Sequence, residues 1–197
     1  MYKKQVKLQK PFCLLAVIAS VLVFAYSLGL VTDLYDSLYA ARGYVTGAEI
    51  FDDIQPFNHQ LLLVGLGLII LSLGLFLTST HVRRRYYIGN YLATAIWSVA
   101  AVAAMVWSHI QVEAFKHQFL TQVNFTELKA HADSFKTLYT ESTFWFDVHY
   151  VVMAVVLLAV VILVGNVFWK ISLMKQEAEL LAGSDAKQTK GAAAKIQ

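Results

Sequence analysis

The sequence predicts an all-α membrane protein: an antiparallel four-helix transmembrane bundle with short helices in the two outer loops. Three observations lead to this prediction. Four apolar stretches of about 20 residues occur along the chain, none of them contains Asp, Glu, Lys, Arg or His, and basic residues gather in alternate connections. With 58% hydrophobic residues, the 197-residue chain is also more apolar than ordinary soluble domains, in which the share is about 45–50%.

The four apolar stretches are the predicted transmembrane spans, at residues 12–31, 61–80, 87–107 and 150–169. About 20 residues in a helix rise roughly 30 Å, which is the thickness of the hydrocarbon core of a bilayer. The stretches are too long for strands and do not alternate with a two-residue period. Because the backbone in lipid must satisfy its own hydrogen bonds, helices are the expected structure.

Basic residues predict which side of the membrane each connection faces. The segments 1–11, 81–86 and 170–197 together carry 12 of the 16 Lys and Arg residues. Short segments rich in Lys and Arg stay in the cytoplasm. We therefore expect both termini to be cytoplasmic, 32–60 and 108–149 to be outer loops, and the location to be a plasma or inner membrane. The polar composition of the tail predicts disorder from about residue 184.

The first outer loop is expected to begin with helix and to continue without regular structure. Thr32 can cap a short helix to Ala41, with Gly43 at the position that ends a helix. The alternative is that this segment continues the first span. Residues 44–58 are predicted to be irregular, because acidic residues and Pro56 interrupt them.

The second outer loop is expected to be largely helical. The third span is predicted to continue as a helix through His117, and Asn124 with Glu127 resembles a capping box for a further helix to about Tyr139. The tripeptide beginning at Asn124 also matches the acceptor pattern for N-glycosylation.

Histidines at one depth are the best candidates for chemistry. His59, His109 and His149 are all predicted to reach the outer interface, and Glu113 lies one turn after His109. Imidazole and carboxylate groups are common ligands of transition metals, so these four residues are the candidate metal site. The alternative is that interfacial histidines are present because amphipathic rings suit this depth. A transition metal is accordingly the one cofactor that the sequence suggests.

Small residues mark candidate packing faces on two spans. Ala93, Ala100 and Ala104 lie on one face of the third span, and Gly67 and Gly74 form a similar line on the second. Small side chains allow membrane helices to approach each other closely. We therefore expect the third span to pack on two sides, against its own bundle and against a second protein.

No motif in the sequence specifies a reaction, so the expected function is non-enzymatic: a membrane subunit, scaffold or assembly factor of a larger membrane complex. The expected partners are the bilayer and other membrane protein subunits or further copies of the chain, and not nucleic acid. The alternative is a membrane metalloenzyme or redox protein that uses the outer histidines. A small oligomeric transporter or channel comes third, because the spans lack the ionisable groups that ion paths use.

Overall fold

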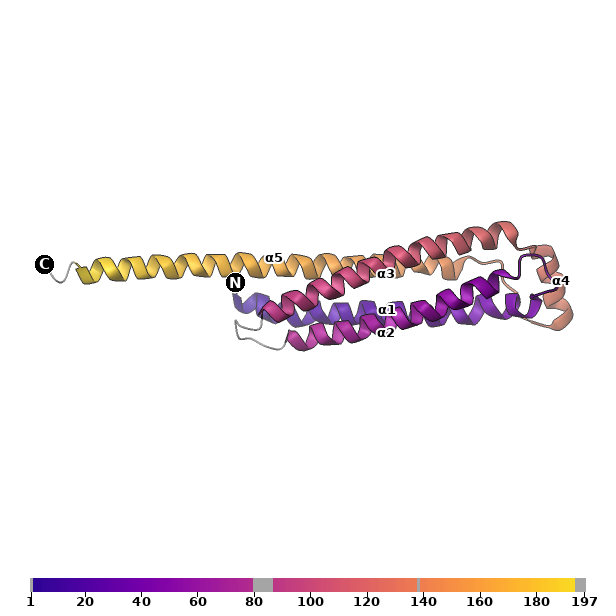
Figure 1. The fold of residues 1–197 in the computed structure, drawn as a ribbon, viewed down its shortest axis with the longest axis horizontal. Coiled ribbons are helices and arrows are strands. Elements are labelled where there is room, and N and C mark those ends of the chain that lie inside the picture. The colour runs from indigo at the N-terminus through magenta and orange to yellow at the C-terminus, as the bar shows by residue number, and fades with distance from the viewer. Residues whose placement is uncertain (1, 80–86, 138, 194–197) are drawn as a thin grey trace.

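The computed structural model describes residues 2–79, 87–137 and 139–193, and these ranges form five α-helices without a strand (Figure 1). The helices are α1 (Tyr2–Ala41), α2 (Ile50–Thr78), α3 (Tyr87–Gln122), α4 (Phe125–Phe135) and α5 (Phe144–Ala193). The predicted all-α bundle is therefore confirmed. The basic link at 81–86, on which part of the predicted orientation depends, lies outside the described residues.

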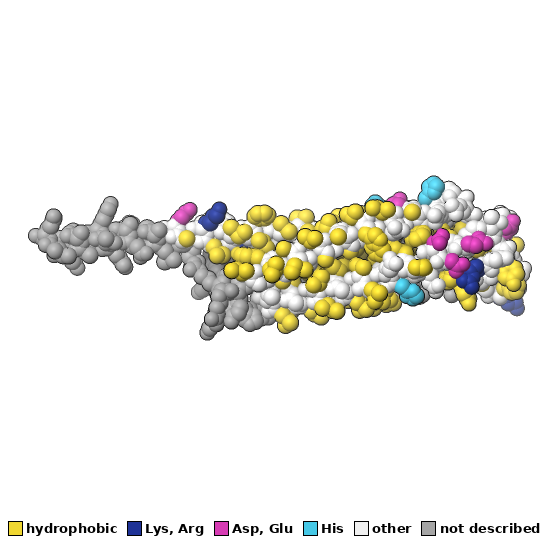
Figure 2. Space-filling view, viewed as in Figure 1, with side chains coloured by type: hydrophobic (Ala, Val, Ile, Leu, Met, Phe, Trp, Pro, Cys, Tyr) yellow, Lys and Arg dark blue, Asp and Glu magenta, His cyan; other side chains and the backbone are white. Residues whose placement is uncertain are grey.

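Four of the described helices are long and apolar enough to cross a bilayer, over Lys7–Leu30, Ile50–Thr78, Ile88–Gln122 and Phe144–Leu180. Large apolar side chains such as Ile70, Val99 and Val161 are exposed on the outside of the bundle. Figure 2 shows apolar side chains along the length of the bundle, with the visible charged side chains toward its two ends. Exposed apolar surface of this extent suits lipid rather than water, so the protein is an integral membrane protein with several spans.

The four long helices pack in a ring: α1 against α2, α2 against α3, α3 against α5, and α5 against α1. Consecutive long helices run in opposite directions, and α4 crosses one end of the bundle, where it packs against α1 (Figure 1). We call this the α4 end. Near the middle of the bundle's length, the buried indole N–H of Trp97 donates a hydrogen bond to the Ser20 hydroxyl at 3.1 Å, which joins α3 to α1.

Two glycines permit close helix contacts within the bundle. A Cβ atom placed on Gly65 of α2 would lie 2.9 Å from the Cα atom of Phe24 on α1. A Cβ atom on Gly29 of α1 would lie 2.5 Å from the indole ring of Trp145 on α5. A real Cβ atom does not come this close to a backbone atom, so α1 can reach α2 at Gly65 only with hydrogen at that position. At Gly29, a larger side chain would require the Trp145 ring to move.

The connection between α1 and α2 is shorter than the sequence predicted. α1 continues to Ala41, so this segment extends the first span and is not a separate helix capped by Thr32, and Gly43 follows with φ of +78°. The prediction of irregular structure through residue 58 is wrong, because α2 begins at Ile50 and contains Pro56. Pro56 is the seventh residue of α2 and removes one backbone hydrogen bond, but the helix face with Ile50, Phe51, Ile54 and Phe57 is buried in the core and stabilises the helix.

Only half of the predicted capping box forms at the start of α4. The Asn124 side chain accepts a hydrogen bond from the backbone N–H of Glu127 at 3.3 Å, as expected of an N-cap. The Glu127 carboxylate instead accepts from the backbone N–H of Thr46 at 3.5 Å, and Asn124 N–H donates to the Thr46 carbonyl at 3.0 Å. The helix ends before the predicted Tyr139, since Lys136 takes a left-handed conformation with φ of 53°.

α5 is the longest helix, and it extends past the other helices at the end opposite α4 (Figure 1). It continues without interruption to Ala193, through the segment for which the sequence predicted disorder. Alanine, lysine and glutamine are frequent there, and all three residues favour a helix.

Candidate functional site at the α4 end of the bundle

Three aromatic side chains with titratable groups meet between α1, α3 and α5 near the α4 end. The imidazole rings of His109 on α3 and His149 on α5 are nearly parallel, at 10°, with their centroids 5.8 Å apart. The phenol ring of Tyr26 on α1 lies 5.6 Å from the His149 ring. We call Tyr26, His109 and His149 the histidine cluster.

The histidine cluster is closed off from the surroundings, although it is polar. His149 is 1% exposed and Tyr26 is 4% exposed, whereas His109 is half-buried. Three buried polar atoms have no hydrogen-bond partner among the described residues: His149 Nε2, His109 Nδ1 and the Tyr26 hydroxyl oxygen. Buried polar atoms in proteins are nearly always paired, so this concentration marks a place where a polar group or a proton can be accommodated.

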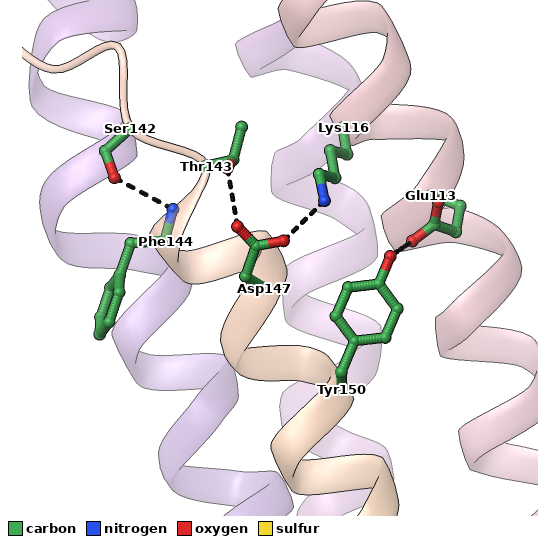
Figure 3. A network of polar contacts seen from close by, with 7 residues as sticks. All are labelled: Glu113, Lys116, Ser142, Thr143, Phe144, Asp147 and Tyr150. Atoms are coloured by element: carbon green, nitrogen blue, oxygen red, sulfur yellow. Dashed lines mark hydrogen bonds and ion pairs between the residues drawn. The ribbon is translucent and has the colours of Figure 1, made fainter.

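A network of hydrogen bonds joins α3 to α5 beside the histidine cluster (Figure 3). The Tyr150 hydroxyl donates to the Glu113 carboxylate, and the two side chains point toward each other in Figure 3. The Lys116 ammonium lies 2.6 Å from Asp147 Oδ1, while the Thr143 hydroxyl donates to Asp147 Oδ2 at 2.7 Å. Asp147 therefore both pairs with α3 and helps to fix the first turn of α5.

The start of α5 is held by two further hydrogen bonds of the preceding segment. The backbone N–H of Phe144 donates to the Ser142 hydroxyl at 3.2 Å, which satisfies one of the free donors of the first helical turn. The backbone N–H of Asp147 donates to the Thr143 carbonyl at 2.9 Å. These contacts fix the direction in which α5 leaves the α4 end, and with it the position of His149.

The structure brings together only part of the predicted metal site. His109 and His149 are neighbours, and Glu113 lies one turn along α3, where its carboxylate is hydrogen-bonded to Tyr150. His59 is exposed on α2. Within the described ranges, no group of three or more His, Cys, Asp or Glu side chains is arranged so that it could hold a metal ion. We therefore assign none of these residues as a metal ligand.

A second polar cluster lies toward the opposite end and was not predicted. Lys170, expected to be a cytoplasmic surface residue, is only 2% exposed, and its ammonium donates to the side-chain carbonyl of Asn90. The Asn90 amide in turn donates to the Thr78 hydroxyl at 2.9 Å, so the chain of contacts joins α5, α3 and α2. Asn90 and Asn166 are amide residues in otherwise apolar spans, and this was the signal in the sequence.

An apolar groove of about 380 Å³ lies between α2 and α3, and we call it the α2–α3 groove. Its lining residues are Val64, Gly67, Leu68, Leu71, Ala100, Ala104 and Trp107. Three of the predicted packing residues, Gly67, Ala100 and Ala104, thus line one surface. A Cβ atom on Gly67 or on the exposed Gly74 would meet no atom within 4 Å, so neither glycine packs within the bundle. Ala93 is half-buried and packs against the core.

The described part of the chain therefore offers three features for a functional argument: the histidine cluster, the Lys170 cluster and the α2–α3 groove. The first two are interior, and the third opens on the apolar outside of the bundle. Comparison of the chain with protein-family models, curated proteins and solved structures found no match.

Proposed function

We propose that this protein is a non-enzymatic membrane subunit, a scaffold or assembly factor that packs against another membrane protein within a larger complex. The observation that supports this proposal is the α2–α3 groove with its small lining residues. Membrane helices associate by close packing rather than by the hydrophobic effect, because lipid is as apolar as their side chains. A groove lined by Gly67, Ala100 and Ala104 allows the backbone of a partner helix to come near.

Gly65 and Gly67 lie within one turn of α2 but face different surroundings. Gly65 faces α1 and makes the close contact that only glycine allows, whereas Gly67 faces the α2–α3 groove and has open space beside it. Glycine in a helix is less favourable than alanine by about 1 kcal/mol. If a helix of another protein packs against Gly67, the absence of a side chain there has the same explanation as at Gly65, which packs against α1.

The two other predicted functions have less support. The metalloenzyme lacks a metal-holding group among the described residues. For a transporter in a single copy, the interior of the ring is closed at the level of Trp97, which is fully buried and bonded to Ser20. The subunit therefore remains the function that the geometry favours.

The test is mass spectrometry of the proteins that co-purify with the tagged chain from its native membranes in mild detergent. We expect a membrane protein in stoichiometric amount with the wild type, and its loss with Gly67→Leu. Gly165→Leu is the matched control, because Gly165 is an exposed glycine on α5 that also has open space beside it. A wild-type protein that purifies alone would contradict the proposal, as would equal recovery of the partner with both variants.

A further inference from the structure

We propose that the histidine cluster is a proton-sensitive contact, which holds α3 against α5 at neutral pH and releases it when the α4 end is acidified. The proposal is independent of the proposed function, since it concerns the contact inside the chain and not the α2–α3 groove. It rests on the geometry of His109 and His149: nearly parallel rings, centroids 5.8 Å apart, and one of the two rings sealed in the core.

The contact suits two neutral imidazoles and not two charged ones. An imidazolium at each position would place two positive charges about 6 Å apart, in surroundings of low dielectric constant where water cannot screen them. The Tyr26 ring on the other side of His149 offers a neutral phenol and no counter-charge. A second proton in the histidine cluster is therefore strongly disfavoured as long as the contact stays closed.

The charged groups described near the histidine cluster are bonded to other side chains and not to His149, which is closed in between α1 and α3. Lys116 on α3 and Asp147 on α5 pair with each other, while Tyr150 of α5 binds Glu113 of α3. On α2, the neighbour of α3, His59 is exposed. His149 therefore has no counter-charge bonded to it among the described residues and stays neutral as long as the contact is closed.

Release of the contact follows from protonation of His149. Opening the contact between α3 and α5 exposes His149, which can then take a proton like an ordinary histidine near pH 6.5. The free energy of opening falls as the pH drops below that value, because the open state binds one more proton than the closed state. The Lys116–Asp147 pair is partly exposed, and such pairs hold helices together only weakly.

The first test compares thermal unfolding in detergent at pH 7.5 and pH 5.0. We expect the wild type to lose several degrees of its unfolding midpoint on acidification, and His149→Gln to lose less than half as much. His109→Gln removes the neighbouring ring but leaves His149 buried, so it should lose an intermediate amount. His117→Gln is the matched control, since His117 is an exposed histidine on α3, two turns beyond His109. An equal loss in all four proteins would overturn the proposal. If His149→Gln does not fold, His149→Phe, which keeps a ring in the same place, carries the comparison.

The second test separates opening of this contact from general acid unfolding. Spin labels at Ile110→Cys on α3 and Val151→Cys on α5, both exposed positions next to the histidine cluster, report the distance between the helices. Cys13→Ser removes the one native cysteine. We expect the distance to increase at pH 5.0 and to stay constant when His149→Gln is added. A distance that does not change with pH, or that changes equally with His149→Gln, would rule out the contact as the sensor.

Discussion

The Tyr150 hydroxyl donates a hydrogen bond to the Glu113 carboxylate, and this single bond joins α5 to α3 one turn beyond the stacked imidazoles. It lies at the boundary between the sealed histidine cluster and the partly exposed Lys116–Asp147 pair. The pairing keeps the carboxylate on the α3–α5 side of the bundle, where it faces the same region as His109.

Removal of either partner of this bond is expected to have the same effect. Tyr150→Phe and Glu113→Leu should each lower the free energy of unfolding by about 1 kcal/mol, since the bond is worth that amount at a partly exposed site. The double variant should cost no more than the larger single change, because both remove one interaction. Equilibrium unfolding in mixed micelles measures these values. Tyr39→Phe, at an exposed tyrosine on α1, is the control, and strict additivity would show that the two side chains act separately.

The buried ammonium of Lys170 is expected to stabilise the end opposite α4. Lys170→Ala should lower the free energy of unfolding by about 2–3 kcal/mol, because it leaves a cavity and removes the donor to Asn90. Lys170→Met should cost roughly half as much, since methionine fills the space and needs no hydrogen bond. Lys175→Met, at an exposed lysine one turn further along α5, should be close to neutral. Equal losses for Lys170→Met and Lys175→Met would show that the buried contact contributes nothing.

Two leucine substitutions on α2 should differ in their effect on the stability of the isolated protein. Gly65→Leu should lower the free energy of unfolding by about 3 kcal/mol or more, because its Cβ atom would lie 2.9 Å from the backbone of α1. Gly67→Leu should leave it unchanged or raise it by up to about 1 kcal/mol, since leucine favours the helix. Thermal unfolding of the purified proteins decides the matter. A strong loss with Gly67→Leu would mean that the α2–α3 groove serves folding rather than a partner.

The start of α4 should depend on the side chain of Asn124. Asn124→Ala removes the acceptor for the Glu127 N–H, which costs about 1 kcal/mol and should speed amide hydrogen exchange in α4 about fivefold. Asn124→Asp should retain slow exchange, because aspartate caps equally well. Thr126→Ala destroys the glycosylation pattern but leaves the cap in place, so it separates the two roles of this tripeptide. Fast exchange in Thr126→Ala would contradict the capping argument.

The four spans could be predicted because the requirements of a bilayer, length and apolar composition, are local properties of the chain. The start of α2 could not, since the two aspartates and Pro56 are typical of a loop and the burial of Ile54 and Phe57 depends on the rest of the bundle. The half-formed capping box has the same origin, because the partner of Glu127 is Thr46, some 80 residues away in the chain.

The level of the candidate residues along the bundle could be predicted from the sequence, but the side to which each helix turns them could not. Counting the helical rise placed His59, His109 and His149 at one level, and two of them indeed meet. The exposure of His59 depends on the rotation of α2 within the bundle, which residue spacing does not specify. Lys170 shows the converse, since it was counted in the predicted cytoplasmic segment but is buried, with its ammonium bonded to Asn90 and lying over the Tyr91 ring.

The unbroken length of α5 has a mechanical consequence. Its 50 residues correspond to a rod of about 75 Å that carries His149 near one tip and extends past the bundle at the other. A lever of that length turns a change of tilt of about 5° near the histidines into a displacement of about 6 Å at the far tip. A tilt of this helix at the α4 end would therefore displace its opposite end, without any chemical group crossing the membrane.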